Sequence, residues 1–428
     1  MKKENALCGL LLFTLLPVSA QKKLPTVKAP HILTSVKALE TNYTDTVICI
    51  DVMSNVDYTV STSESWINEV SQNIEDNANA KSNALYLSIA GNPAKTEPSR
   101  SAVVTIQDAD KTITKQLSVK QTADPSLVYR NPVVNRSLPD PTIIKAHNGN
   151  FYLYATEDIR NTPIFRSKDL IKWEQVGTAF TDATRPTFEK NGGLWAPDIN
   201  YINGKYVLYY SMSVWGGGET CGIGVAISNG PEGPFVDKGK LFRSNEIGVH
   251  NSIDQFFISD NGKNYLVWGS FNGIYAIELT EDGLAIQPGA VKQQIAGTAF
   301  EASYIHKRNG YYYFFGSWGS CCEGLKSTYK TVYGRSTSLF GPYVNKQGGS
   351  MMDNNYDVLI QGNDFFKGVG HNAEIVTDND GQDWIMYHGY SVKNYNGRVL
   401  MLDKVQWKND WPYVEGNAPS SEAIKPVF

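Results

Sequence analysis

The chain has little of what would place it in several common protein classes. Its 428 residues carry a net charge of −4, with 39 Lys and Arg against 43 Asp and Glu. This balance excludes a strongly basic surface for nucleic acid or an anionic membrane. No set of Cys and His residues has the spacing of a zinc site, and helical periodicity is weak throughout. We therefore expect a β-rich protein that binds no nucleic acid and is a monomer.

Cysteine is scarce. One of the five cysteines, Cys8, lies in the apolar N-terminal segment, which leaves Cys49, Cys221, Cys321 and Cys322. Four thiols in a chain of this length do not make a disulfide scaffold. Cys49 lies in an apolar run and is expected to be buried. The adjacent pair Cys321–Cys322 is compatible with a disulfide between neighbours or with two thiols on opposite faces of a strand.

Long hydrophobic runs are absent beyond the N-terminus. Residues 1–20 have the pattern of a signal peptide, because two lysines precede an apolar stretch that ends at Val18, and small residues precede Gln21. The stretch is too short to span a membrane. We predict that the chain is cleaved and then secreted or periplasmic, with no membrane span.

Aromatic residues are abundant, at 12% with 24 Tyr and 9 Trp. Aromatic side chains suit the half-buried surfaces of β-sheets, so most are expected in a core. Some are also expected to line a sugar-binding cleft.

Residues 28–123 are predicted to form a small β-sandwich. Four runs of alternating polarity are separated by polar and Gly-, Asn- or Pro-containing segments, as in sandwich domains; they are residues 46–52, 84–89, 102–106 and 115–121. No paired carboxylates or nucleophile constellation occur in this module. A linker is predicted over residues 122–134.

Residues 130–428 contain a fivefold internal repeat. Each copy has an acidic or polar residue, a strand, a Gly-containing turn and an aromatic strand, and the copies begin at Asp140, Asp198, Asp254, Glu301 and Asn372. The first residues are 58, 56, 47 and 71 positions apart. Such hairpins at this spacing predict a five-bladed β-propeller. The fold class is therefore all-β, a propeller preceded by a sandwich.

The propeller would bring the first residue of each repeat to a similar height around one axis. Four of these five residues are acids, and His371 lies beside the fifth. Each acid could simply cap a turn or pair with a nearby Lys or Arg. A ring of acids is nevertheless a poor core, because unpaired buried charge is costly, so we expect a catalytic cluster at the channel mouth.

Paired carboxyl groups are the chemistry of glycoside hydrolysis, in which one acts as acid and the other as base or nucleophile. Asp140, between two prolines, is in a stiff context that suits an ionised base. Glu301 follows Ala299-Phe300 and precedes an aromatic strand, and such apolar surroundings would raise its pKa. Asp254 could keep Glu301 protonated by repulsion between like charges.

The region 130–428 resembles glycoside hydrolase family 43 and, within it, the endo-1,5-α-L-arabinanases. The resemblance is carried by an ordered set of motifs: Leu138-Pro-Asp140-Pro, Leu194-Trp195-Ala-Pro-Asp198, Asn251-Ser-Ile-Asp254, Phe300-Glu301-Ala-Ser-Tyr304, Gly370-His371-Asn372, Gly319-Ser-Cys-Cys-Glu-Gly324 and Val405-Gln-Trp407 with Trp411-Pro412. The resemblance implies an inverting enzyme that cleaves α-1,5-linked arabinan in plant cell walls. Asp140 would be its base, Glu301 its acid and Asp254 the modulator of the acid's pKa.

The resemblance also implies ligand contacts. His371 would hold a channel ion, usually calcium, with waters at the other positions; a hydrogen-bonded core histidine is the alternative, since calcium prefers oxygen ligands. Trp195 would stack on a sugar or else pack between blades. The substrate-binding residues implied are Asp140, Trp195, Gly224, Asn251, Asp254, Ser270 and Phe271.

The chain departs from the family pattern at three positions. Ser303 and Gln255 stand where the family usually has proline, and Asn272 stands where arabinanases have a sugar-stacking tryptophan. The last change bears on endo action. Alternatives on the same fold are an exo-acting α-L-arabinofuranosidase or a β-xylosidase, and a non-catalytic glycan-binding propeller is the alternative from another class.

The N-terminal module resembles the BACON domain found beside carbohydrate enzymes. The matching features are Ser65-Trp66-Ile67, Arg100 before a Val-Val-Thr-Ile strand, and the strand over residues 117–122. The resemblance implies either a spacer or a sugar-binding module.

Overall fold

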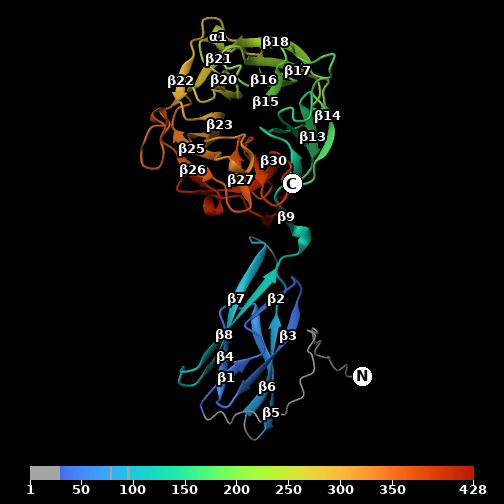
Figure 1. The fold of residues 1–428 in the computed structure, drawn as a ribbon, viewed down its shortest axis with the longest axis vertical. Helices are drawn as coiled ribbons and strands as arrows, with labels where there is room; N and C mark the ends of the chain where they lie inside the picture. The colour runs from blue at the N-terminus through green and yellow to red at the C-terminus, as the bar shows by residue number, and fades with distance from the viewer. Residues whose placement is uncertain (1–28, 78–79, 94–96) are drawn as a thin grey trace. The chain divides into compact units, whose positions relative to one another are not determined.

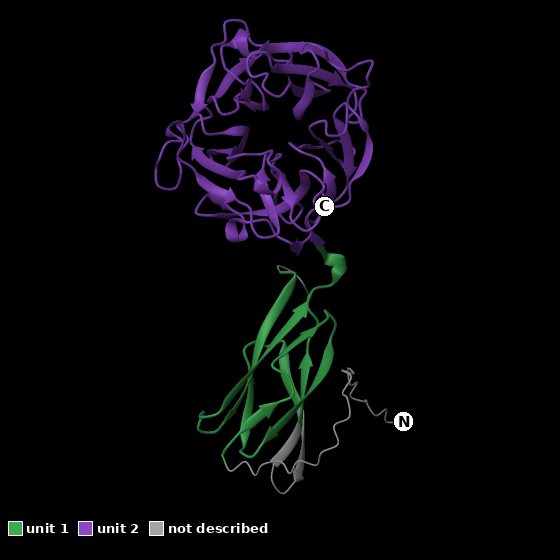
Figure 2. Cartoon of the chain, in the orientation of Figure 1, with its two compact units in different colours: residues 1–128 green, residues 129–428 purple. Residues whose placement is uncertain are grey.

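The computed structural model describes residues 29–428 except 78–79 and 94–96, so the predicted signal peptide lies outside the described residues. The chain divides into two compact units, residues 1–128 and 129–428 (Figure 2). The division falls within the segment that the sequence marks as a linker. No helix in the described part of the chain is long and apolar enough to cross a membrane.

The first unit is a β-sandwich of two four-stranded sheets (Figure 1). One sheet has the order β1 (Ile32–Thr34), β3 (Thr46–Ser54), β6 (Ala80–Ile89) and β5 (Ile67–Asn77). The other has the order β2 (Ala38–Thr41), β8 (Thr114–Thr122), β7 (Ser99–Asp108) and β4 (Tyr58–Thr62). All neighbouring strands are antiparallel except β2 and β8.

The four strands predicted for the sandwich lie within β3, β6, β7 and β8. Their alternating residues fill one core, which includes Ile50, Leu87, Val104 and Val119, because successive side chains of a strand point to opposite faces. The sequence features at Trp66 and Arg100 belong together structurally. The Arg100 guanidinium lies 4.2 Å from the centre of the Trp66 ring, a cation–π contact within the sandwich.

The second unit is a five-bladed β-propeller, as predicted, with its blades arranged around a central axis (Figure 1). Each of the first four blades is an antiparallel four-stranded sheet whose strands follow chain order. Blade 1 contains β11 (Thr142–Lys145), β12 (Phe151–Tyr154), β13 (Pro163–Ser167) and β14 (Glu174–Thr178). Blade 2 contains β15 (Gly193–Ile202), β16 (Lys205–Ser213), β17 (Gly222–Ser228) and β18 (Val236–Arg243).

Blades 3 and 4 repeat this order. Blade 3 contains β19 (Phe256–Asp260), β20 (Lys263–Trp268), β21 (Ile274–Leu279) and β22 (Gln293–Ala296). Blade 4 contains β23 (Glu301–Arg308), β24 (Tyr311–Trp318), β25 (Lys330–Ser336) and β26 (Asp357–Ile360). The described helices are all short: α1 (Ser244–Ile247) and the 3-10 turns Pro125–Leu127, Gly324–Lys326, Met351–Asp353 and Glu415–Asn417.

Blade 5 closes the ring with strands from both ends of the unit. It contains β27 (Phe366–Gly370), β28 (Val376–Thr377), β29 (Asp383–Ser391), β30 (Val399–Lys408) and β31 (Trp411–Tyr413), and β10 (Val134–Ser137) pairs with β30. A second pair joins β9 (Val128–Arg130) to β32 (Glu422–Ile424). The buried Asn131 side chain accepts a hydrogen bond from the Leu402 backbone N–H at 2.9 Å and donates one to the Leu402 carbonyl at 2.8 Å. These contacts fasten the two ends of the propeller together.

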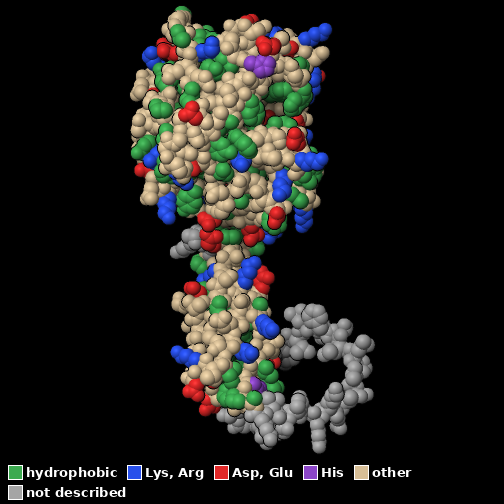
Figure 3. Space-filling view, turned by 60° about the vertical axis from the view of Figure 1, so that its left-hand side comes forward, with side chains coloured by type: hydrophobic (Ala, Val, Ile, Leu, Met, Phe, Trp, Pro, Cys, Tyr) green, Lys and Arg blue, Asp and Glu red, His purple; other side chains and the backbone are tan. Residues whose placement is uncertain are grey.

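Aromatic side chains dominate the blade cores. The largest fully buried side chains include Trp268, Trp384, Tyr209 and Tyr313. Aromatic rings also join neighbouring blades, as where Tyr209 stacks on Phe257 with ring centres 5.8 Å apart. Most aromatics are therefore structural, as the composition predicts. On the face shown in Figure 3, side chains of both charge signs are scattered over the surface without a broad basic patch.

Candidate active site

A residue with left-handed backbone lies in the innermost strand of every blade or within two residues of it. These residues are Asp140 (φ 52°), Ala196 (φ 41°), Asp254 (φ 60°), Ala302 (φ 54°) and His371 (φ 48°). Non-glycine residues adopt this conformation at a cost of about 1–3 kcal/mol, so a fivefold recurrence marks a feature of the fold. The equivalent positions in the five blades are therefore these residues. Glu301 precedes this position in blade 4, and Asp198 comes two residues after it in blade 2.

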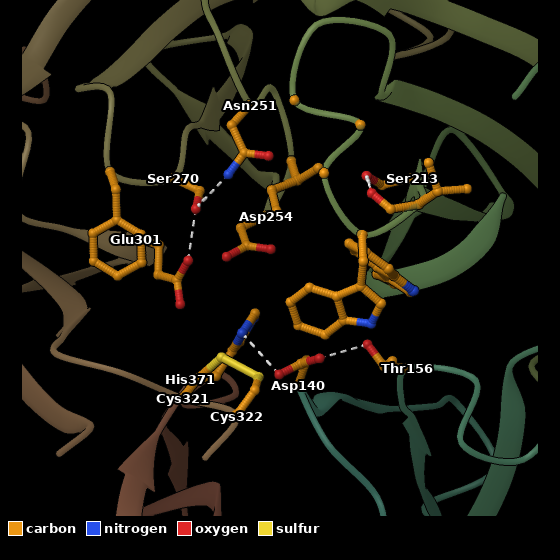
Figure 4. Close-up of a pocket in the computed structure, with 18 of the residues that line it drawn as sticks. Asp140, Thr156, Ser213, Asn251, Asp254, Ser270, Glu301, Cys321, Cys322 and His371 are labelled. Carbon is orange, nitrogen blue, oxygen red and sulfur yellow. Dashed lines mark hydrogen bonds and ion pairs between the residues drawn. A yellow bond between two sulfur atoms is a disulfide. The ribbon is translucent and has the colours of Figure 1, made fainter. Parts of the chain in front are cut away.

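A cleft of about 460 Å³ lies at the mouth of the channel. Every substrate-binding or catalytic residue expected from the sequence lines it, with the exception of Gly224: Asp140, Trp195, Asn251, Asp254, Ser270, Phe271, Glu301 and His371. Figure 4 shows the carboxyl groups of Asp140, Asp254 and Glu301 facing one another across it. Gly224 lies in β17 outside the cleft lining, and a Cβ there would come within 2.3 Å of the Tyr210 ring. Its role in this structure is to make room for Tyr210.

Asp140 is held by positive charge and hydrogen bonds. Arg398 Nη1 donates to both carboxylate oxygens, at 3.1 and 3.3 Å, and Thr156 Oγ1 donates to Oδ2 at 2.6 Å. His371 Nδ1 lies 3.2 Å from Oδ1. Burial alone would raise the pKa of Asp140, but Arg398 and His371 outweigh burial and hold that pKa well below its usual value. Asp140 is therefore ionised at neutral pH and can accept a proton.

A second histidine, His388, supports the backbone of Asp140. The Asp140 backbone N–H donates to His388 Nδ1 at 3.1 Å. Burial lowers the pKa of His388 to about 4, so its ring is neutral and Nδ1 is free to accept that hydrogen bond. His388 positions the carboxylate and adds no charge to the cleft.

Glu301 has the opposite electrostatic environment. No cationic side chain in the described part of the chain forms an ion pair with it; instead Ser270 Oγ donates to Oε2 and the Tyr329 hydroxyl donates to Oε1, each at 2.6 Å. Burial raises the pKa of Glu301 above its usual value, although both hydrogen bonds favour the ionised form. Asn251 Nδ2 donates to Ser270 Oγ at 2.9 Å and so fixes the hydroxyl next to the acid.

Asp254 lines the same cleft as these two groups. Burial raises its pKa to about 7, His371 opposes that shift, and the charges of Glu301 and Asp140 add to it. Asp254 Oδ2 accepts a hydrogen bond from the backbone N–H of Ala302 at 3.2 Å. Because Ala302 follows Glu301 in the chain, this contact ties the position of Asp254 to that of Glu301.

Asp198, expected in the same ring, lies elsewhere. It lines a smaller cavity further along the channel together with Glu374 and is not part of the cleft lining. Its Oδ2 accepts hydrogen bonds from the Phe257 backbone N–H and the Asn200 side chain, at 2.7 and 2.8 Å. Burial and the neighbouring Glu374 raise the pKa of Asp198 well above its usual value. The repeat thus supplies three acids to the cleft and directs the fourth into the channel.

Sequence reasoning missed Arg398, Tyr329 and Trp215, which line the cleft, and His388, which is buried against the Asp140 backbone outside the cleft lining. Arg398 and His388 come from blade 5, and the repeat pattern of acid, strand, turn and aromatic strand does not predict either residue. Tyr329 lies at the end of a long loop. Trp215 follows the end of β16, and its side chain is 80% exposed while its ring lies 5.5 Å from that of Trp195. The sequence signal for Trp215 is its position directly before a Gly-Gly-Gly segment.

Comparisons with known proteins agree with this geometry. A family model described as Glycosyl hydrolases family 43 matches residues 129–412. An extracellular endo-α-(1→5)-L-arabinanase of Bacillus subtilis is 35% identical over 294 residues, which cover 65% of this chain and 88% of that protein. An extracellular exo-α-(1→5)-L-arabinofuranosidase of Cellvibrio japonicus is 31% identical, covering 64% of this chain and 86% of its own length.

Solved structures show the same likeness. The endo-arabinanase of Bacillus licheniformis is 32% identical with a TM-score of 0.59, and the match covers 67% of this chain and 99% of that one. An α-L-arabinanase of Cellvibrio cellulosa, solved with arabinohexaose, is 31% identical with a TM-score of 0.59 over 65% of this chain and 96% of that one.

Proposed function

Because this chain belongs to the glycosyl hydrolases of family 43, we propose that it hydrolyses the α-1,5 bonds of arabinan, with inversion at the anomeric carbon. Arabinan is the substrate class named for relatives at 30–35% identity. The endo mode is proposed because the first of those relatives is an endo-arabinanase, and no feature of the described residues favours the exo mode over it.

The opposed pKa shifts of Asp140 and Glu301 carry the proposal. One carboxyl group of the cleft is held ionised by Arg398, whereas burial favours the protonated form of the other. Glycoside hydrolysis needs such a pair at one bond. A non-catalytic binding protein has no use for this arrangement.

The reaction follows from those two states. Asp140 accepts a proton from a water molecule, whose oxygen forms the new bond to the anomeric carbon. Glu301 gives its proton to the departing glycosidic oxygen, so that the old C–O bond breaks with a neutral leaving group. Asp140 then releases its proton to solvent and Glu301 takes one up. The carboxyl group of Asp254 interacts with that of Glu301 through charge repulsion. This repulsion disfavours loss of the proton from Glu301 before the bond breaks.

Aromatic surface for sugar rings comes from blade 2. Asn272, at the position where a tryptophan was expected, lines the cleft and turns its amide back to donate to the Ser270 carbonyl at 3.0 Å. Trp195 and Trp215 line the same cleft. Their rings supply stacking surface from a neighbouring blade, which supports binding of an oligosaccharide despite the change at Asn272.

Products formed from debranched arabinan by the purified mature chain test the proposal. We expect a ladder of short arabino-oligosaccharides, with the β-anomer formed first in the proton NMR spectrum, and no products from the matched Glu301→Ala variant. Arabinose as the sole product would show exo action. An α-anomer formed first would contradict inversion, and absence of products would contradict arabinan as the substrate.

We also propose a calcium ion beside His371. No group of three or more His, Cys, Asp or Glu side chains forms a metal site among the described residues, so water would complete the coordination. The channel cavity next to His371 is lined by Asp254 and by two buried oxygens without hydrogen-bond partners, Asn372 Oδ1 and Ser303 Oγ. Oxygen donors of this kind suit calcium. The bound ion would add positive charge near the catalytic carboxylates. Calorimetric titration of calcium into the wild type and into His371→Ala tests the proposed site. Equal calcium binding by the two proteins would contradict it.

Export completes the proposed function, because polymeric arabinan lies outside the cell. The Bacillus subtilis and Cellvibrio japonicus relatives are named extracellular. We expect the intact mass of the exported chain to correspond to a first residue at Gln21, and a retained N-terminal segment would contradict cleavage there.

For the N-terminal sandwich we propose the role of a spacer, since its Trp66 is engaged by Arg100. Binding of the isolated unit to insoluble arabinan would contradict this role.

A further inference from the structure

A disulfide between the adjacent residues Cys321 and Cys322 forms part of the cleft wall. It lies in the loop between β24 and β25, on the same cleft as Asp140, His371 and Arg398. Figure 4 shows the sulfur–sulfur bond beside His371 and Asp140. Cys322 is exposed and Cys321 is half-buried, so both are accessible from the cleft.

This disulfide does little for stability. A cross-link stabilises a fold mainly by restricting the unfolded chain, and the gain grows with the number of residues enclosed. Here the two cysteines are neighbours in sequence, so almost no chain is enclosed. Its place in the cleft, rather than its contribution to folding, is what requires an explanation.

The loop that carries the disulfide is held firmly. Its two ends are joined by a hydrogen bond from the Tyr329 backbone N–H to the Ser320 carbonyl at 3.1 Å, and by one from the Ser320 N–H to Thr328 Oγ1 at 3.0 Å. The Tyr390 hydroxyl donates to the Cys321 carbonyl at 3.2 Å. The Tyr395 ring stacks on that of Tyr390 with ring centres 5.7 Å apart. The sulfur atoms are thus presented to the cleft in a fixed position.

The chemistry of this wall is apolar. Among the described residues no hydrogen bond reaches either sulfur, and disulfide sulfur is a polarisable, weakly accepting surface. A furanose ring has hydroxyl groups at its edges and C–H groups on a face. Asp140, Arg398 and Asn251 can bind hydroxyls, while the C–H face needs an apolar surface to contact.

We propose that the Cys321–Cys322 disulfide is a binding surface for the C–H face of an arabinofuranosyl residue, on the Asp140 side of the cleft. Blade 4 carries the disulfide and blade 2 carries Trp195 and Trp215, two blades that are not neighbours in the ring. The sugar chain is therefore held between a sulfur surface and an aromatic one. This inference rests on the proposed arabinan specificity and adds the contact that recognises the sugar.

The test compares arabino-oligosaccharide kinetics of the full mature chain with and without the disulfide. In the double variant Cys321→Ser/Cys322→Ser, we expect KM to rise about tenfold with kcat within twofold and the melting temperature unchanged, since hydroxyls replace an apolar surface. Leu325→Ala is the matched control, because Leu325 is an exposed apolar residue of the same loop outside the cleft lining. Its KM is expected to equal that of the wild type.

Reduction of the wild type provides a second measurement that needs no variant. Dithiothreitol transfers two electrons and two protons to the disulfide and becomes a cyclic disulfide itself. Cys321–Cys322 is the disulfide found in the part of the chain that the structure describes, so we expect the same rise in KM on reduction. An unchanged KM in both experiments, or a loss of kcat together with melting temperature, would overturn the inference. Failure of the oxidised wild type to cleave arabinan would instead overturn the proposed function.

Discussion

Replacing Glu301 with glutamine is expected to lower kcat on arabinan about a thousandfold, while hydrolysis of a dinitrophenyl arabinofuranoside stays within tenfold of the wild type. Arabinan releases a sugar alkoxide, which needs a proton as the bond breaks, and general acid catalysis of this kind contributes about 10²- to 10⁴-fold. Dinitrophenolate leaves without a proton. Glutamine keeps the shape of Glu301 and can still accept a hydrogen bond from Ser270 or Tyr329, but it cannot donate the proton.

The pH dependence gives the same prediction a second readout. Burial raises the pKa of Glu301, and the acid must be protonated to act, so wild-type kcat/KM on arabinan falls as pH rises through that pKa. Asp140, whose pKa is held low, must be ionised, so activity also falls as pH drops through the pKa of the base. The glutamine variant, assayed on the dinitrophenyl substrate, is expected to keep the acidic decline and lose the alkaline one.

Glu374→Gln is the matched control for Glu301→Gln. Glu374 is a half-buried glutamate whose pKa is also raised by burial, yet it lies in the channel cavity and outside the cleft lining. Its variant is expected to retain wild-type activity on arabinan within threefold. Equal losses on both substrates in Glu301→Gln, or an alkaline decline that persists, would show that Glu301 is not the acid.

The sequence predicts the propeller because its signal is repeated. Five hairpins with the same order of acid, strand, glycine turn and aromatic strand leave few other folds possible, and the blades lie where the repeats begin. The closure of the ring is not predictable in this way. It depends on contacts such as that of Asn131 with Leu402, which join residues from opposite ends of the unit.

The candidate active site is predicted in part for the same reason. Asp140 and Asp254 occupy equivalent left-handed positions, so the repeat reveals both. The repeat misleads at Asp198, because Asp198 lies two residues further along its strand than Asp140 and Asp254 do, which places its side chain in the channel cavity. Arg398 and His388 set the charge and the position of Asp140, but Arg398 directly precedes β30 and His388 lies in β29, and neither has a counterpart in the repeat. Their identification needs the fold.

Replacing Asp140 with asparagine is expected to lower kcat about a thousandfold or more on both arabinan and the dinitrophenyl substrate. The attacking water must lose a proton whatever the leaving group, so an activated substrate cannot compensate. This pattern is the reverse of that expected for Glu301→Gln, which spares the activated substrate. Comparing the two variants on the two substrates therefore assigns base and acid without a bound ligand.

The asparagine variant also tests the charge network, because Arg398 would lose its carboxylate partner. Uncompensated buried charge costs about 3–5 kcal/mol, so a lower melting temperature is expected together with the loss of activity. Asp378→Asn is the matched control. Asp378 is a buried carboxylate that accepts a hydrogen bond from Trp384 Nε1 at 2.9 Å, and it is not part of the cleft lining. That variant is expected to lose stability and keep activity at 25 °C. If Asp140→Asn lost no more activity than Asp378→Asn, its defect would be one of folding, and the water would have to be activated by another group of the cleft, such as Asp254.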